Sequence, residues 1–299
     1  MRALDELLLL GAESGLYPTF IDNTKEELSF GNEDISIGAM GDSFYEYLLK
    51  VWLQGGRREM KYRRMYDESV NGIMDKLVHM SRPNYLTYVA ELKRKRVIHK
   101  MDHLSCFLGG TLALGAYTHP DGLESITAQR QLKTGKQLAY TCYQMYARSK
   151  SGLAPEYVNF DNQGDDFAKG NAPYYILRPE TAETFYILYH LTKDPVYREW
   201  GWEIFQAIEE HCKTDAGYAA IQDVDTMQQS NRMESFFLAE TLKYLYLLQE
   251  DTHDIDLLNT VSEKFLDILI FHTQLLNLSF FLNGSMSSIQ KLIHFAFSV

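Results

Sequence analysis

The 299-residue sequence is poor in positive charge. Lysine and arginine together number 29 against 40 aspartates and glutamates, and the formal net charge is −11. Nucleic-acid-binding surfaces need clustered Lys and Arg. The one basic run, from Lys93 to Arg96, is short and is typical of a solvated hairpin tip. We therefore expect no nucleic-acid partner.

Long apolar runs are scarce as well. The opening residues, MRALDELLLLGAESG, place a short leucine run beside Asp5 and Glu6, which is unlike a signal peptide and is typical of the last turns of an amphipathic helix. The apolar stretch 265–282 is interrupted by polar residues and falls short of the ~20 predominantly apolar residues of a membrane span. We expect no transmembrane segment and a chain that begins inside a domain.

Cysteine is rare, with only Cys106, Cys142 and Cys212. No two of them have the spacing of metal ligands. The residues alone leave two interpretations open: three buried thiols, or one disulfide and one free thiol in an oxidising compartment.

The residues that are present predict an all-α protein. Apolar residues make up 45% and charged residues 23%, as in a globular protein with a substantial core. Helical periodicity predicts helices near 2–12, 42–54, 59–80, 102–117, 123–148, 180–192, 195–212 and 233–249. Short hairpins are expected where 85–91 pairs with 97–100 and at 217–221. Long polar loops alternate with tight connections, which indicates helical hairpins in a ring with functional loops on one rim.

Acidic residues open three of these helices, namely Asp42, Glu180 and Glu234. A single carboxylate in a first turn is explained by the helix dipole alone. Each of these helices is apolar on most faces and should be buried, so together they predict a barrel mouth lined with carboxylates. The second acids Glu46, Glu183 and Glu240 follow on the same helices. Such like charges need compensation from a cation, from sugar hydroxyls or from an arginine such as Arg178.

Four motifs together resemble glycoside hydrolase family 47, the class I α-1,2-mannosidases that trim mannose from N-linked glycans. They are GDSFYEYLLKVWLQGG (41–56), KMDHLSCFLGGTLALG (100–115), LRPETAETFYILYHLT (177–192) and RMESFFLAETLKYLYLL (232–248). The resemblance covers residues 1–258. The Met101-Asp102-His103 stretch and the hairpin segment YLTYVAEL (85–92) are most similar to the endoplasmic-reticulum branch, and the mannosidase-like degradation lectins of the family are a weaker match.

The resemblance implies a partial (α/α) barrel over 1–258, with short β-hairpins in the loops, a calcium ion at the barrel floor and hydrolysis with inversion. An inverting pair stands ~6.5–9.5 Å apart. By motif position, Glu180 matches the general base and Asp42 a catalytic carboxylate on the acid side. The other matches are acids that hold calcium-bound waters or sugar hydroxyls (Glu46, Glu183, Glu240), an aromatic that stacks on the deepest sugar (Phe236) and residues that contact that sugar or its neighbour (Arg178, His103, Glu156).

The same resemblance implies no direct protein ligand for calcium among these residues, with Glu180, Glu183 and Glu240 as candidates that act through water. It also implies a Cys106–Cys142 disulfide, high-mannose N-glycans on glycoproteins as partners, and a place in the endoplasmic reticulum or Golgi. The full-length relatives are membrane-anchored.

The chain departs from the family pattern in three places. The family's opening helices, with a further essential glutamate, are not seen. Met40 stands where the reticulum enzymes carry Arg and Golgi enzymes an apolar residue. After residue 258 a divergent apolar tail, 259–299, replaces a motif whose Thr binds calcium. We therefore expect little or no hydrolysis of α-1,2-linked mannose by the chain as given.

Three functions are consistent with these features. The first is a calcium-dependent mannosyl-oligosaccharide 1,2-α-mannosidase. The second is a mannose-glycan-binding protein, similar to the degradation lectins, that holds its ligand without turnover. The third, an all-α structural or repeat protein whose acids are only helix caps, is disfavoured by the length of the motifs.

Overall fold

The computed structural model describes residues 6–7, 10–22, 24, 29–160, 166–250 and 257–258. Most of the helix expected near 2–12 lies outside these residues, and so does the segment 259–299.

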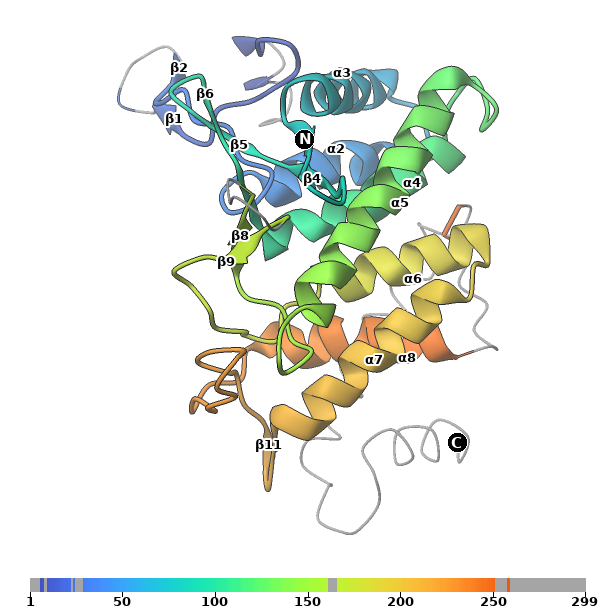
Figure 1. The fold of residues 1–299 in the computed structure, drawn as a ribbon. Helices are drawn as coiled ribbons and strands as arrows, with labels where there is room; N and C mark the ends of the chain where they lie inside the picture. Colours follow the sequence, from blue (N-terminus) through green and yellow to red (C-terminus); the bar gives the residue numbers. More distant parts are fainter. Residues whose placement is uncertain are drawn as a thin grey trace.

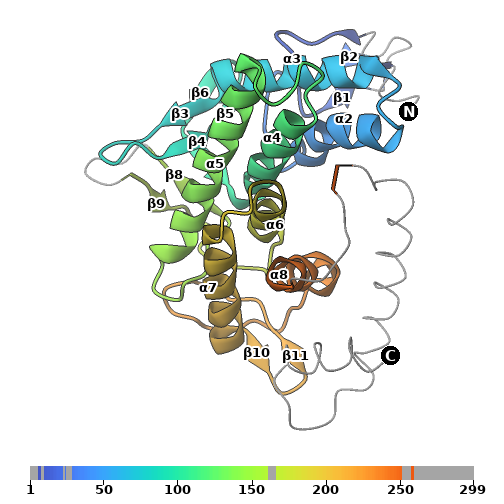
Figure 2. The ribbon, with the colours of Figure 1, turned by 90° about the vertical axis from the view of Figure 1, so that its right-hand side faces the viewer.

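Two layers of helices form a curved arc (Figures 1 and 2). The inner layer contains α2 (Asp42–Gln54), α4 (Phe107–Tyr117), α6 (Glu180–Thr192) and α8 (Lys243–Gln249). The outer layer contains α3 (Met60–Lys76), α5 (Ile126–Ala147) and α7 (Val196–His211). Each inner helix packs on the next one, and each outer helix packs against the inner layer. The predicted all-α arrangement of helical hairpins is confirmed.

Helix α4 lies in the middle of the arc and is buried on every side from Phe107 to Ala116. Its apolar residues and glycines suit this position, because a helix that is apolar all round has no face for solvent. Gly109 and Gly135 let α4 and α5 approach closely: a Cβ on Gly135 would lie 2.6 Å from the Gly109 carbonyl oxygen. Any larger side chain there would push the two layers apart.

The helix expected over 59–80 ends earlier, and its last residues form a strand. β3 (Val78–Met80) pairs antiparallel with β4 (Thr87–Val89). The expected pairing of 85–91 with 97–100 is wrong for 87–89, which pair with β3, and holds only at Glu91, which pairs with Ile98. β-Branched and aromatic residues favour strands on both sides of the turn 81–86, so β4 pairs with the residues that directly follow α3. A second hairpin follows, with β5 (Glu91–Lys93) paired to β6 (Arg96–Ile98).

The basic run from Lys93 to Arg96 does form a hairpin tip. Arg94 and Lys95 have φ of +48° and +65°, as the two central residues of a tight hairpin turn require. Both side chains are exposed, in agreement with the prediction.

The remaining strands are short and lie in the loops. β7 (Lys100–Asp102) pairs with β8 (Tyr157–Asn159), and β8 pairs with β9 (Ala168–Lys169). β10 (Lys213–Thr214) pairs with β11 (Gly217–Tyr218), close to the hairpin expected at 217–221, and β1 (Ile21–Asp22) pairs with β2 (Ser29–Phe30).

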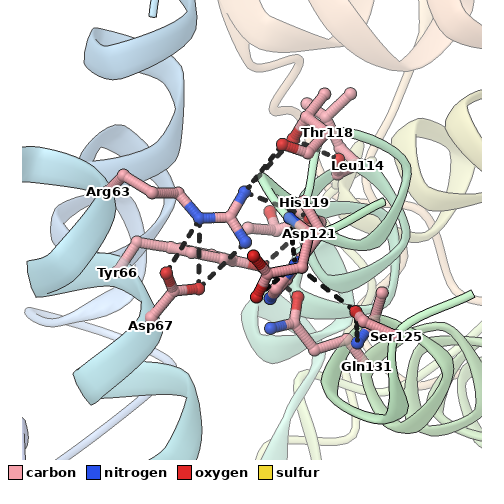
Figure 3. A network of polar contacts seen from close by, with 12 residues as sticks. Arg63, Tyr66, Asp67, Leu114, Thr118, His119, Asp121, Ser125 and Gln131 are labelled. Carbon is pink, nitrogen blue, oxygen red and sulfur yellow. Dashed lines mark hydrogen bonds and ion pairs between the residues drawn. The ribbon is translucent and has the colours of Figure 1, made fainter. Parts of the chain in front are cut away.

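A buried arginine ties α3 to the end of α4 (Figure 3). The Arg63 side chain is 0% exposed and binds the Asp67 carboxylate through both Nε and Nη2, at 2.9–3.1 Å. Its Nη1 donates to the carbonyl oxygens of Gly115 and Thr118, each at 3.2 Å. These carbonyls lie at the C-terminal end of α4, where backbone acceptors lack helical partners, so Arg63 satisfies an otherwise open helix end.

A disulfide joins the inner and outer layers. Cys106 ends the 3₁₀ helix η1 (His103–Cys106), Cys142 lies on α5, and their Cα atoms are 5.9 Å apart. The expected Cys106–Cys142 pairing is confirmed, and Cys212 is a buried free thiol. Among the described residues, no helix combines the length and apolarity of a membrane span.

Candidate active site

The predicted site residues lie at the starts of the inner helices. Asp42 is the first residue of α2, Glu180 is the first residue of α6, and His103 begins η1 directly before α4. These starts lie near one another, because His103 contacts Glu180 and the charge of Glu180 acts on Asp42. The positive end of a helix dipole favours carboxylates at these positions.

His103 holds Glu180 in place. Its Nδ1 lies 3.2 Å from the Glu180 Oε2, and its Nε2 lies 2.7 Å from the Tyr146 hydroxyl and 3.3 Å from Thr181 Oγ1. The His103 ring is 1% exposed. An imidazole that is hydrogen-bonded at both nitrogens has a fixed orientation, so His103 holds the Glu180 carboxylate in a defined position.

Arg178 makes a forked ion pair with Glu156. Its Nε lies 2.8 and 3.0 Å from the two carboxylate oxygens, and its Nη2 lies 2.7 Å from Oε2. Planar bidentate pairs of this kind have well-defined geometry. The charges of Glu156 and Glu180 outweigh burial, so the pKa of Arg178 is raised. The guanidinium thus links the loop before α6 to Glu156, the residue directly before β8.

Asp42 belongs to the same electrostatic unit. Burial raises the pKa of the Asp42 carboxyl, and the negative charge of Glu180 raises it further. The backbone N–H of Ser43, which donates to Asp42 Oδ1 at 2.9 Å, and the charge of Arg178 act in the opposite direction. The net effect is a carboxyl that keeps its proton to higher pH than an exposed aspartate does.

A second group of acids surrounds Lys50, deeper along α2 and α6. The Lys50 ammonium contacts Glu46, one turn earlier on α2, and lies 3.2 Å from Glu183 Oε1. Burial, followed by the charge of Glu183, raises the pKa of Glu46 to about 7. Burial alone would lower the pKa of Lys50, but the charges of Glu183 and Glu46 outweigh it and raise that pKa well above its usual range.

The start of the last inner helix completes this group. Glu240 lies in a π-helical segment, η2 (Phe237–Leu242), and burial together with Glu183 raises its pKa. Single π-helical turns are frequent at functional sites. The Tyr244 hydroxyl donates to Glu183 Oε1 at 3.4 Å. Burial lowers the pKa of Lys243, although Glu240 and Glu183 act against that shift.

Phe236 directly precedes η2 and is half-buried. Its neighbour Phe237 is fully buried, with its ring 4.7 Å from that of Tyr218. The role of Phe236 as a stacking surface for a sugar stays a prediction.

The structure therefore links eight of the nine predicted site residues, all except Phe236, through hydrogen bonds, ion pairs and neighbouring charges. Within the described part of the chain, no group of three or more His, Cys, Asp or Glu side chains is arranged to bind a metal directly. The carboxylates around Lys50 are nevertheless oxygen donors of the type that calcium prefers, and they would reach an ion through bound water.

Sequence reasoning missed several residues of this site, among them Lys50, Tyr146 and Thr181. Lys50 had a signal, because it lies four residues after Glu46 and such pairs meet on one helix face. Tyr146 had none, since it comes from the far end of α5. Thr181 lies next to Glu180, but nothing in the sequence predicts that its hydroxyl reaches His103.

Comparisons with known proteins agree with this geometry. A model of glycosyl hydrolase family 47 matches residues 1–274. The matched range continues past 258, and of the residues from 251 onward the structure describes only 257–258, so the domain boundary at 258 stays a prediction.

Curated relatives show substantial identity over most of the chain. A mannosyl-oligosaccharide alpha-1,2-mannosidase IA of Drosophila melanogaster is 45% identical over 79% of this chain and 35% of its own length. The endoplasmic reticulum mannosyl-oligosaccharide 1,2-alpha-mannosidase of Rattus norvegicus is 40% identical over 89% of this chain and 39% of its own length. The chain thus spans little more than a third of the curated relatives it matches.

A solved structure shares the fold. The alpha-1,2-mannosidase from Trichoderma reesei superposes with a TM-score of 0.74 at 28% identity, over 85% of this chain and 56% of that one. Its similarity and the family match cover the helices that carry the site. On these grounds the chain belongs to glycosyl hydrolase family 47.

Proposed function

We propose that this chain forms the part of an α-1,2-mannosidase active site that carries its general base, and that the complete site acts on terminal α-1,2-linked mannose with inversion. The observation that supports this most directly is that Glu180, held by His103, acts electrostatically on Asp42 at the start of another inner helix. Inverting glycosidases need two carboxyl groups of different protonation, one on each side of the sugar.

The two carboxyl groups have environments that suit different roles. The pKa of Asp42 is raised by burial and by Glu180, which favours the protonated form that can donate to the leaving oxygen. Glu180 is oriented by His103 and lies near the Arg178 guanidinium, so as a carboxylate it can remove a proton from an attacking water. Arg178 and Glu156 would hold hydroxyls of the bound sugar or of its neighbour.

The acids around Lys50 suit a calcium site reached through water. Glu180, Glu183 and Glu240 would accept hydrogen bonds from calcium-bound waters, and Glu46 would accept them from such waters or from sugar hydroxyls. Bound calcium supplies positive charge that orients water and sugar oxygens. Phe236 would stack on the apolar face of the deepest sugar.

The substrate class follows from the relatives named above, which act on mannosyl-oligosaccharides. We propose high-mannose N-glycans as the partner and the secretory pathway, endoplasmic reticulum or Golgi, as the place. The disulfide Cys106–Cys142 supports an oxidising compartment.

A second function, glycan binding without turnover, has support from Lys50. The Lys50 ammonium compensates part of the negative charge of Glu46 and Glu183 without a metal. The remaining donors and acceptors would still hold mannose. The two functions differ in turnover and share binding.

The experiment measures mannose release from α-1,2-mannobiose by this chain and by the chain joined to the remaining catalytic segments of the rat relative. We expect little release by the chain itself and turnover by the joined protein. Glu180→Gln in the joined protein should reduce kcat by about 10³-fold, in the range of a lost general base. Glu210→Gln, an exposed carboxylate on α7, serves as the control. Binding of the disaccharide without turnover in the joined protein would favour the second function.

A further inference from the structure

A buried charge cluster lies outside the carboxylates described above. The Lys100 ammonium is 2.8 Å from Asp102 Oδ1 and 3.1 Å from Glu91 Oε1. Glu91 is 7% exposed and Asp102 is 9% exposed. Two carboxylates therefore share one cation in a region that solvent reaches poorly, where charge interactions are strong.

The cluster supports the turn formed by residues 36–41. Ser36 Oγ donates to Glu91 Oε1 at 3.4 Å, and the backbone N–H of Gly38 donates to Ser36 Oγ at 3.0 Å. A Cβ on Gly38 would lie only 2.5 Å from Asp102 Oδ2, so the turn rests directly on that carboxylate. Both acids of the cluster thus contact the same turn.

This turn sets the position of Asp42. The backbone N–H groups of Gly41 and Asp42 both donate to the Gly38 carbonyl oxygen, at 3.1 and 2.9 Å. A shift of Gly38 would therefore also shift Asp42, the first residue of α2. Asp102, the acid beneath Gly38, lies directly before His103.

Asp102 also connects the cluster to Glu180, through the next residue, His103. His103 holds the Glu180 carboxylate at 3.2 Å, and its own backbone N–H donates to the Glu156 carbonyl oxygen at 2.8 Å. Asp102 thus contacts the turn 36–41, which leads to Asp42, and directly precedes His103, which holds Glu180.

We propose that Lys100 is a positioning residue for the Asp42–Glu180 pair: its ion pairs with Glu91 and Asp102 hold the turn 36–41 against β7 and so fix the spacing of the two carboxyl groups. The inference rests on the proposed function for its catalytic consequence, while the positioning itself is a property of the fold. Burial, followed by the charge of Asp102, raises the pKa of Glu91, as expected for two acids that depend on one cation. Without Lys100 the carboxylates of Glu91 and Asp102 repel each other, and the turn 36–41, which contacts both, is no longer held in one position.

The test compares Lys100→Met with Lys100→Arg and Lys95→Met. Lys95 is a matched control, because it lies at the tip of the neighbouring hairpin, is 71% exposed and pairs only with Glu33 among the contacts described here. Hydrogen exchange of the Gly41 and Asp42 amides is measured on the full chain. In Lys100→Met this exchange should accelerate about tenfold or more, because the support of the turn is lost. Both controls should stay near wild type.

Mannose release by the same four variants of the joined protein gives the catalytic readout. Lys100→Met should lower kcat by about 10²-fold with little change in KM, because a misplaced pair affects chemistry more than binding. Lys100→Arg should restore most of kcat. If the joined wild-type protein releases no mannose, the proposed function fails and the amide exchange alone decides the positioning. Unchanged exchange at Gly41 and Asp42 in Lys100→Met would overturn the inference, and so would a uniform acceleration across the chain.

Discussion

Replacing Arg63 by Met should destabilise the protein by about 3 kcal/mol or more. Removing one partner of a buried ion pair costs ~3–5 kcal/mol, because the other charge is left without compensation. Asp67 is 29% exposed and can be partly rehydrated, which places the ion-pair loss at the lower end of that range. The carbonyls of Gly115 and Thr118 also lose their donor, and each unsatisfied buried acceptor adds ~1–3 kcal/mol unless water reaches it.

Thermal unfolding followed by circular dichroism measures this effect. A loss of 3 kcal/mol lowers Tm by about 6–12 °C for a domain of this size class. Arg130→Met is the matched control: Arg130 pairs with Asp75 at 2.7 Å, but the side chains are 50% and 63% exposed. Such a surface pair contributes ~0–1 kcal/mol. Equal Tm changes in the two variants would refute the argument that burial of Arg63 sets its contribution.

The disulfide Cys106–Cys142 and the carboxyl group of Glu46 give two further predictions. Replacing both Cys106 and Cys142 by Ala opens a loop of 36 residues and should cost about 4 kcal/mol in the chain-entropy account; an unchanged urea midpoint would contradict it. The folded-state pKa of Glu46, about 7, exceeds the ordinary glutamate value of 4.5. Between these values the folded state holds a proton that the unfolded state has lost, so stability falls as pH rises. In calcium-free buffer, Glu46→Gln should remove up to about 3 kcal/mol of the change in unfolding free energy between pH 4.5 and pH 7.5. A change between these pH values as large as that of wild type would rule this out.

Much of the helical fold is predictable because each helix has its own signal. Apolar periodicity gives α2, α6 and α7 within a residue or two, and acids in the first turn mark where α2 and α6 begin. The end of α3 is different. Val78–Met80 continue the apolar pattern of the helix, and only pairing with Thr87–Val89 makes them a strand. Such pairing is a tertiary choice that a local pattern does not contain.

The site divides in the same way. Acids at helix starts, such as Asp42 and Glu180, can be read from the sequence because the helix start itself is local. The contacts that orient them are long-range: Tyr146 reaches His103 from another helix, and Lys50 reaches Glu183 across 133 residues of sequence. The π-helical turn around Glu240 also escaped prediction, since its residues favour an ordinary helix equally well.

If Asp42 and Glu180 act as an inverting pair, hydrolysis releases mannose as the opposite anomer, and the anomeric form of the first product tests this role most directly. Proton NMR of α-1,2-mannobiose hydrolysis by the protein joined to the remaining segments of the rat relative should show β-mannose before it equilibrates with the α form. The signal should disappear in Glu180→Gln. Release of α-mannose first, or undiminished release by Glu180→Gln, would contradict the account.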